Sequence, residues 1–264
     1  VVREALEKLA QETNYSICYY KTDTILHDNC QRRPRTFIYF FKADGDRKGA
    51  PQIGFENKTV SIEEFLNRIP ENATQQIQIP MGDICDTMLD YVHDYYGENW
   101  RDNVRLSTLV DDFIKQGKLD DWGEKVASNP KYSDKQKNRV LNYIKHIHEK
   151  IEAHKGFWKI SPTILRKTHL PAAMHKTMNA VLHHNEDRCY TVREWLSTMG
   201  MPYDFEMQGI YPINYYKQIG QNVPARTMQF IASEAVRILN NWDSVERGNK
   251  LDVIICDNIK QTVI

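Results

Sequence analysis

Three arginines within four residues form the most distinctive chemical cluster of the sequence. They are Arg32, Arg33 and Arg35, in the segment HDNCQRRPR of residues 27–35. A guanidinium group presents planar N–H donors that suit a phosphate or the oxygen of a nucleobase. Such a cluster is more often only a solvated loop, and contact with a nucleic acid is the alternative that its chemistry allows.

A second candidate for nucleic-acid contact is the irregular segment GFWKISPTILRKTHLPAAMHK, residues 156–176. It mixes aromatic with basic side chains and contains prolines, a composition suited to a loop that follows a phosphate backbone and enters the major groove. The DNA contacts predicted here are Lys155, Trp158, Lys159, Arg166, Lys167 and Lys176. The histidines nearby do not share a helix face, so no metal site is predicted.

A third candidate is YYKQIGQNVP, residues 215–224. We predict a tight loop here, in which Gly220 permits a turn and Pro224 starts a helix. Unpaired N–H groups and the helix dipole point out of a helix N-terminus, so a small polar ligand could bind at this loop. The simpler reading is a capped C-terminal helix.

Charge and cysteine content limit the class of protein. The 264 residues carry 35 basic and 35 acidic side chains, and the five cysteines have no ligand spacing. We expect a soluble intracellular protein with reduced thiols, since no apolar run could span a bilayer. Charge is uneven along the chain: residues 81–130 have a net charge of −6 and residues 131–176 of +8. The first stretch predicts a scaffold face turned away from DNA, the second a DNA-facing surface.

The surrounding patterns predict mixed α/β structure. Helices are expected over residues 1–13, in DICDTMLDYVHDYY, over residues 133–155 and from Met228, where an apolar stripe through Ile231, Ala232, Ala235, Val236 and Leu239 predicts one buried face. Aromatic and branched runs predict strands over residues 16–21 and 36–42. Capping boxes are predicted at Ser61 with Glu64 and at Thr191 with Glu194.

Three segments resemble signatures of the DNA cytosine-5 methyltransferase family, in the family's order. Gln31, Arg33 and Arg35 fit Q-x-R-x-R, with Cys30 in place of a proline. The family's R-x-x-T-x-R-E signature is matched by Arg188, Thr191, Arg193 and Glu194, with Asn185 replacing a proline. Its Y-[RK]-Q-x-G-N-[AS]-V-P signature is matched by Tyr216, Lys217, Gln218, Gly220, Val223 and Pro224, with Gln221 in place of its asparagine.

The resemblance covers nearly the whole chain but only the C-terminal half of the family. The F-x-G-x-G turn, the Pro-Cys nucleophile loop and the Glu-Asn-Val acid do not occur in the sequence. It implies the edge of a Rossmann-like methyltransferase domain in residues 1–42 and 211–264, and a mostly helical target-recognition domain in residues 43–210. We expect an exposed apolar edge where further sheet strands would pair.

The resemblance also implies roles for particular residues. Arg33 and Arg35 would hold the flipped cytosine and a nearby phosphate, Gln221, Asn222 and Val223 would lie beside S-adenosylmethionine, and Arg193 would join the DNA contacts. The chain is expected to bind double-stranded DNA and to methylate only with an N-terminal methyltransferase part. Its compartment would be the cytoplasm or nucleoid of a bacterium, or a nucleus.

Two alternatives remain open. The chain could be a stand-alone DNA-recognition or regulatory module without catalysis, which predicts sequence-dependent DNA binding in the absence of a catalytic partner. It could also be a relic of the fold that binds neither DNA nor cofactor, which the departures at Asn185 and Gln221 would favour.

Overall fold

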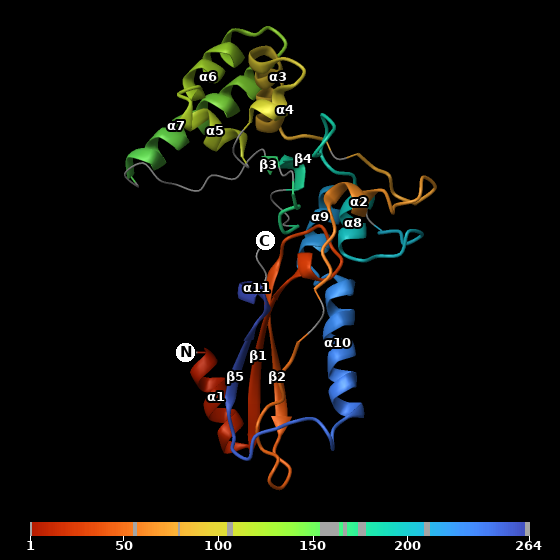
Figure 1. Ribbon diagram of the computed structural model, residues 1–264. Coiled ribbons are helices and arrows are strands. Elements are labelled where there is room, and N and C mark those ends of the chain that lie inside the picture. The colour runs from red at the N-terminus through yellow and green to blue at the C-terminus, as the bar shows by residue number, and fades with distance from the viewer. Residues whose placement is uncertain are drawn as a thin grey trace.

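The computed structural model describes residues 2–54, 57–78, 80–104, 108–153, 164–165, 168–173, 178–208 and 212–261. Figure 1 shows three regions along one long axis: a sheet flanked by two helices, a bundle of helices at the opposite end, and a mixed region between them. Strands and helices are both present, so the predicted mixed α/β class is confirmed. Within the described ranges, every helix is too short or too polar to span a bilayer.

The sheet has three strands in the order β2-β1-β5. The predicted strands correspond to β1 (Tyr15–Asp23) and β2 (Pro34–Lys42), which pair antiparallel over all nine residues. The third strand, β5 (Val253–Asp257), lies parallel to β1 on its other side. Because side chains alternate across a strand, Ile17 of β1 faces one side of the sheet and Cys18 the other.

Helices α1 (Val2–Glu12) and α10 (Ala225–Asn240) cover opposite faces of this sheet (Figure 1). On one face, Ala10 of α1 packs with Ile17 and Tyr19. On the other, Ile231 and Ile238 of α10 pack with Cys18, Tyr20, Phe41, Ala50 and Ile53. Both helices were predicted. Ala50 and Ile53, which the predicted boundary near residue 43 assigns to the small domain, thus pack into the sheet core.

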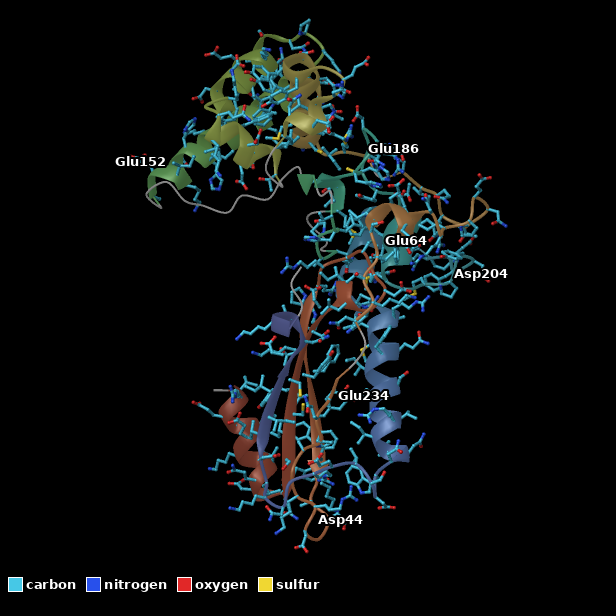
Figure 2. The ribbon with its side chains drawn as sticks, in the orientation of Figure 1. Asp44, Glu64, Glu152, Glu186, Asp204 and Glu234 are labelled. Carbon is cyan, nitrogen blue, oxygen red and sulfur yellow. The ribbon has the colours of Figure 1, made fainter. Side chains whose placement is uncertain are left out.

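The buried face of α10 differs from the predicted stripe. The helix buries Thr227, Ile231, Glu234 and Ile238. Of the predicted apolar positions, Met228, Val236 and Leu239 remain 42%, 53% and 65% exposed. Glu234, labelled in Figure 2, is buried because its carboxylate accepts hydrogen bonds from Arg237 at 2.7 Å. The ion pair compensates the charge of Glu234 on the face that is turned toward the sheet. Of the apolar residues predicted to be buried, Ile231 is among those that the helix buries.

Five helices form the bundle: α3 (Asp83–Tyr96), α4 (Trp100–Asn103), α5 (Leu109–Lys115), α6 (Leu119–Ser128) and α7 (Asp134–Ala153). Trp100 and Trp122 are fully buried in its core. Acidic side chains of α3 and α6 pair with basic ones on or just before α7: Asp90 with Lys131 at 2.6 Å, Asp120 with His148 at 2.7 Å, and Asp83 with Arg139. The acidic stretch and the start of the basic stretch thus partly compensate each other within one bundle.

The mixed region contains short elements around a core that includes Leu170, Tyr190 and Trp195. They are η1 (Thr24–Leu26), α2 (Ile62–Leu66), β3 (Ile164–Leu165), η2 (Met178–Ala180), β4 (Val181–Leu182), α8 (Val192–Thr198), α9 (Pro212–Gln221) and, at the end of β5, α11 (Asn258–Gln261). Strands β3 and β4 pair in parallel.

The predicted capping box of α8 is confirmed, whereas that of α2 is present in one direction only, because the Glu64 carboxylate pairs with Arg68. The Ser61 side chain caps α2 by accepting the N–H of Glu64, and the Thr191 and Glu194 capping box of α8 is present in both directions. The predicted loop over residues 215–224 is wrong in its first part, because α9 continues to Gln221 and only residues 222–224 separate it from α10. Gly220 is therefore helical and provides no turn.

Candidate functional site

The three signature segments meet at the C-terminal end of α8. From the arginine-rich segment, Asn29 donates to the Thr198 carbonyl at 2.6 Å and the Gln31 amide donates to the Thr198 hydroxyl at 3.1 Å. From the other side, the Ala225 N–H at the start of α10 donates to the Met199 carbonyl at 2.8 Å. The last turn of α8 therefore fixes the arginine-rich segment and the α9–α10 junction relative to each other.

Arg33 joins these segments directly. Its guanidinium donates to the Ala173 carbonyl at 3.3 Å and to the Gly220 carbonyl at 3.0 Å, while its backbone N–H donates to Asp23 Oδ1 at 2.8 Å. The residue is 5% exposed, and burial lowers the pKa of its guanidinium. In this arrangement Arg33 holds α9 against the end of β1, which is a positioning role.

Arg35 has a different environment, at the exposed start of strand β2, where it pairs with Thr22 of β1. One guanidinium N–H donates to the adjacent Pro34 carbonyl at 2.7 Å. A guanidinium has five N–H donors, so most of those on Arg35 can reach a ligand. The neighbouring Arg32 side chain is 44% exposed and pairs with Asp23 at 3.3 Å. The sheet thus presents two cationic side chains at the end where β1 finishes.

The predicted cofactor residues lie between α9 and α10. Gln221 and Asn222 are exposed and Val223 is half-buried. The Asn222 amide donates to the Gln218 carbonyl at 3.0 Å, and its side chain borders a cavity of about 390 Å³. Gln218, Ile219 and the methionines of the α8 end also line this cavity. The contact of Gln221, Asn222 and Val223 with S-adenosylmethionine stays a prediction.

Arg188 and Glu194 form the most strongly connected ion pair of the second signature. Two guanidinium nitrogens of Arg188 lie 2.9 Å from the two carboxylate oxygens of Glu194. Glu186, labelled in Figure 2, adds a second carboxylate on the exposed side. Burial alone would raise the pKa of Glu194, but hydrogen bonds from Arg188 and the Thr191 N–H lower it. This network fixes the start of α8, where the Thr191 and Glu194 capping box was predicted.

Arg193, predicted to contact DNA, is fully buried instead. Its guanidinium donates to the Thr74 carbonyl at 2.6 Å, to the Thr74 hydroxyl at 2.7 Å, to the Pro202 carbonyl at 2.9 Å and to the Phe205 carbonyl. Every one of these partners is uncharged. The predicted DNA contact does not fit this placement, because the guanidinium is used to join α8 to the two loops beside it.

The remaining predicted DNA contacts lie outside the described residues. They are Lys155, Trp158, Lys159, Arg166, Lys167 and Lys176. Their part in DNA recognition stays a prediction.

Sequence reasoning missed two polar residues of this site, Asn29 and Thr198. Both are buried and both connect the arginine-rich segment to α8. The Asn29 side chain also accepts the Gln31 N–H at 2.9 Å, which forms an Asx turn. The sequence signal of such a turn is an asparagine two residues before the residue whose N–H it binds. That signal was available in DNCQ, but it does not identify the partner 169 residues away.

His27, at the start of the same segment, makes folding sensitive to acid. Its imidazole is fully buried, lies 2.9 Å from the Thr22 hydroxyl and stacks on Phe230. Burial lowers its pKa to about 4. The folded-state pKa lies below the unfolded value of about 6.5, so this stability is fully present above pH 6.5 and is lost as the pH falls toward 4.

We expect the free energy of unfolding in urea to be about 2 kcal/mol lower at pH 5 than at pH 7.5 on account of His27. Burial also lowers the pKa of His183 to about 4, so protonation of His183 further lowers the free energy of unfolding at acid pH. His27→Gln should reduce the pH dependence, because it removes the buried imidazole. An unchanged pH dependence in His27→Gln would contradict the assignment.

Comparison with known families identifies the family to which these segments belong. The family model described as C-5 cytosine-specific DNA methylase matches residues 1–237. No curated protein gives a significant match. The matched range includes the three segments that meet at α8, and it covers most of the sequence. The chain therefore belongs to the C-5 cytosine-specific DNA methylase family.

Proposed function

We propose that this chain is the C-terminal part or subunit of a DNA cytosine-5 methyltransferase. In this role it recognises a DNA sequence and helps to position a flipped cytosine and S-adenosylmethionine. Family membership supports DNA cytosine methylation as the activity. The observation that supports the positioning role is the meeting of all three signature segments at the end of α8, with Arg35 exposed beside them.

The reaction needs a thiolate that this chain does not provide. C5 of cytosine is a poor nucleophile, so the family first adds a cysteine thiolate to C6 and protonates N3. The sequence has no Pro-Cys dipeptide. The cysteine nearest the site, Cys30, is fully buried, and burial raises the pKa of its thiol to about 12. Burial also raises the pKa of Cys18.

The other three cysteines are no better suited. A hydrogen bond with Cys85 and, as the second cause, burial raise the pKa of the Cys189 thiol. Cys85 itself lies in the core of the helical bundle. Cys256 is on β5, 3.6 Å from the Cys18 sulfur. We infer that the nucleophile comes from an N-terminal methyltransferase part, on another chain or outside these 264 residues, and that these residues alone are inactive.

The residues of this chain divide into three roles. Arg35 would donate hydrogen bonds to O2 of the flipped cytosine and to a nearby phosphate, and Arg33 would hold the segment that carries it. Gln221, Asn222 and Val223 would contact S-adenosylmethionine, which supplies the methyl group when bound. The basic residues after α7 would contact the DNA backbone and bases.

Transfer of labelled methyl groups from S-adenosylmethionine to DNA tests the proposal. The chain would be assayed alone and after mixing with an N-terminal methyltransferase half from the same source, and activity is expected only in the mixture. A mixture whose N-terminal half has serine in place of its Pro-Cys cysteine serves as the negative control. Sequence-selective DNA binding without activity in the mixture would overturn the enzyme proposal and identify a recognition module.

A further inference from the structure

The helical bundle of α3 to α7 and the mixed region have separate cores. Trp100 and Trp122 belong to the first core, and Tyr190 and Trp195 belong to the second. Met81, just before α3, packs against both. Figure 1 shows the bundle at the end of the molecule opposite the sheet. The orientation of the bundle therefore depends on the contacts at the boundary between the two cores.

One set of boundary contacts lies at the start of α3 and carries no charge. The Gly82 N–H donates to the Asn179 carbonyl at 3.3 Å, and the Cys85 thiol makes a hydrogen bond with Cys189. Leu182 of β4 adds an apolar contact with the bundle core. The two polar contacts reach only the first turn of α3. They fix the place where the helix begins, but not the direction in which it continues.

Asp187 supplies a charged contact further along the bundle. One of its carboxylate oxygens lies 2.6 Å from His93 Nε2 on α3, and the other lies 2.5 Å from Arg101 Nη2 on α4. At about 1.5 Å per residue, His93 is about 12 Å along α3 from Cys85. Asp187 thus holds the bundle at a second point. Two separated points fix an orientation that one point leaves free.

This contact differs from an isolated surface ion pair, which contributes little because two long side chains must be ordered. His93 and Arg101 both lie against the buried ring of Trp100, at centroid distances of 6.0 Å for His93 and 4.3 Å for Arg101. The Arg101 side chain is 19% exposed. Because Trp100 already restrains both side chains, they lose less conformational entropy when they pair with Asp187.

The turn that carries Asp187 is connected to α8. The His183 N–H donates to the Arg188 carbonyl at 2.7 Å, and His183 Nδ1 accepts the Glu186 N–H at 3.1 Å. Arg188 in turn pairs with Glu194 of α8 at 2.9 Å. Figure 2 shows Glu186 at the boundary between the bundle and the mixed region. A continuous series of contacts therefore joins the bundle through Asp187 to α8, where the three signature segments meet.

The orientation of the bundle bears on DNA recognition through α7. This helix packs on α3 and is described as far as Ala153, after which the sequence continues into the basic stretch predicted to contact DNA. Leu170 is held to the arginine-rich segment, since its N–H donates to the Cys30 carbonyl at 2.7 Å and its carbonyl accepts the Arg32 N–H at 2.8 Å. Rotation of the bundle would change the separation of Ala153 and Leu170, which flank most of the predicted DNA contacts.

We propose that Asp187 is a positioning residue for DNA recognition, which acts by holding the helical bundle in a fixed orientation to α8. Loss of its charge releases His93 and Arg101, and the bundle turns about the start of α3. Sequence-selective binding then falls, because base contacts need fixed positions whereas phosphate contacts carry no sequence information. The part of the inference that concerns DNA rests on the proposed function. The holding of the bundle does not.

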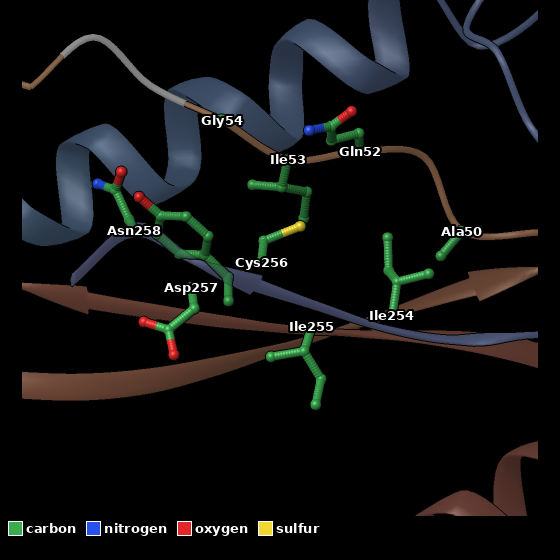
Figure 3. A pocket seen from close by; sticks show the side chains of 10 residues that line it. Ala50, Gln52, Ile53, Gly54, Ile254, Ile255, Cys256, Asp257 and Asn258 are labelled. Atoms are coloured by element: carbon green, nitrogen blue, oxygen red, sulfur yellow. The ribbon is translucent and has the colours of Figure 1, made fainter. Parts of the chain in front are cut away.

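Distances between two spin labels on the full chain test whether Asp187 holds the bundle. Cysteines introduced at Glu124 of α6 and Ser233 of α10, both exposed, would carry the labels. Cys256, which points into a cavity of about 400 Å³ beside β5 (Figure 3), is replaced by serine, since the other four thiols are buried. In Asp187→Asn the distance distribution should become at least about twice as wide. Asp102→Asn, the same change at an exposed position of α4, is the control and should leave the width unchanged.

Binding to two DNA duplexes tests the role in recognition. One duplex carries the sequence that the wild-type chain selects from a random pool, and the other is an unselected sequence. The ratio of the two dissociation constants should fall at least about tenfold in Asp187→Asn. Affinity for the unselected duplex should not weaken, because no phosphate contact is removed. Arg101→Gln should reproduce the loss, and the double variant should add little to it, because the two residues act as one pair.

The outcomes separate this inference from the proposed function. An unchanged distance distribution in Asp187→Asn would overturn the inference, whatever the DNA result. A wider distribution with unchanged discrimination would overturn the role of Asp187 in recognition. If the wild-type chain binds all duplexes equally, the proposed recognition function fails, and the distance distribution alone decides whether Asp187 holds the bundle.

Discussion

Replacing Arg193 by methionine is expected to lower the free energy of unfolding by about 3–5 kcal/mol, because it leaves buried acceptors without a donor. The guanidinium donates to the carbonyls of Thr74, Pro202 and Phe205, and each of these acceptors loses that donor in the variant. Methionine fills much of the same volume, so the loss reports on hydrogen bonding more than on a cavity.

Urea unfolding followed by circular dichroism measures this effect, and Arg35→Met is the matched control. Arg35 is exposed and, among the described residues, its guanidinium donates to the adjacent Pro34 carbonyl, so its replacement should change stability by less than about 0.5 kcal/mol. Equal stability of the two variants would contradict the structural role of Arg193. A selective loss of DNA binding in folded Arg193→Met would restore the DNA contact that the sequence predicted.

Arg193 illustrates why a contact expected from the sequence can differ from the placement of the residue in the fold. A basic residue in a signature of a DNA-modifying family suggests a DNA contact by composition alone. Its true partners come from residues 119 positions earlier and from a loop that folds back over α8. Only the tertiary fold reveals that the chain's carbonyls, not phosphates, surround this guanidinium.

Elements governed by neighbouring residues were predicted well. β1 and β2 follow from aromatic and branched runs, and the Thr191 and Glu194 box follows from a side chain reaching its own helix start. The glycine in α9 misled the prediction, because Gly220 permits a turn without requiring one. Its carbonyl is instead held by Arg33 from the other end of the chain.

The strand β5 was missed although VIICD is a clear local signal. Its pairing with β1 joins residues more than 230 positions apart, which no local pattern specifies. The predicted exposed apolar edge remains a property of the sheet, but the sequence could not say which strand would form it. Among the described residues, both edge strands expose apolar side chains: Ile38 and Phe40 on β2 are 39% and 45% exposed, and Ile255 on β5 is 46% exposed.

Replacing Arg35 by alanine is expected to lower kcat/KM for methyl transfer by the reconstituted mixture about 100-fold, the size of effect that follows loss of one positioned donor to a developing charge. The side chain is exposed and makes one hydrogen bond within the chain, so folding and association with the N-terminal half should be unchanged. Arg3→Ala removes the same charge from an exposed ion pair on α1 and is the matched control.

Arg35→Lys separates charge from geometry. Lysine keeps the positive charge but lacks the planar pair of donors that can contact a base oxygen and a phosphate together. If Arg35 acts through both contacts, lysine should recover less than about one tenth of the lost rate, while the affinity for DNA outside the recognition site should return with the charge. Full recovery by lysine would reduce the role to attraction of the phosphate backbone. An unchanged rate in Arg35→Ala would show that this exposed arginine, at the start of β2, does not touch the reacting cytosine.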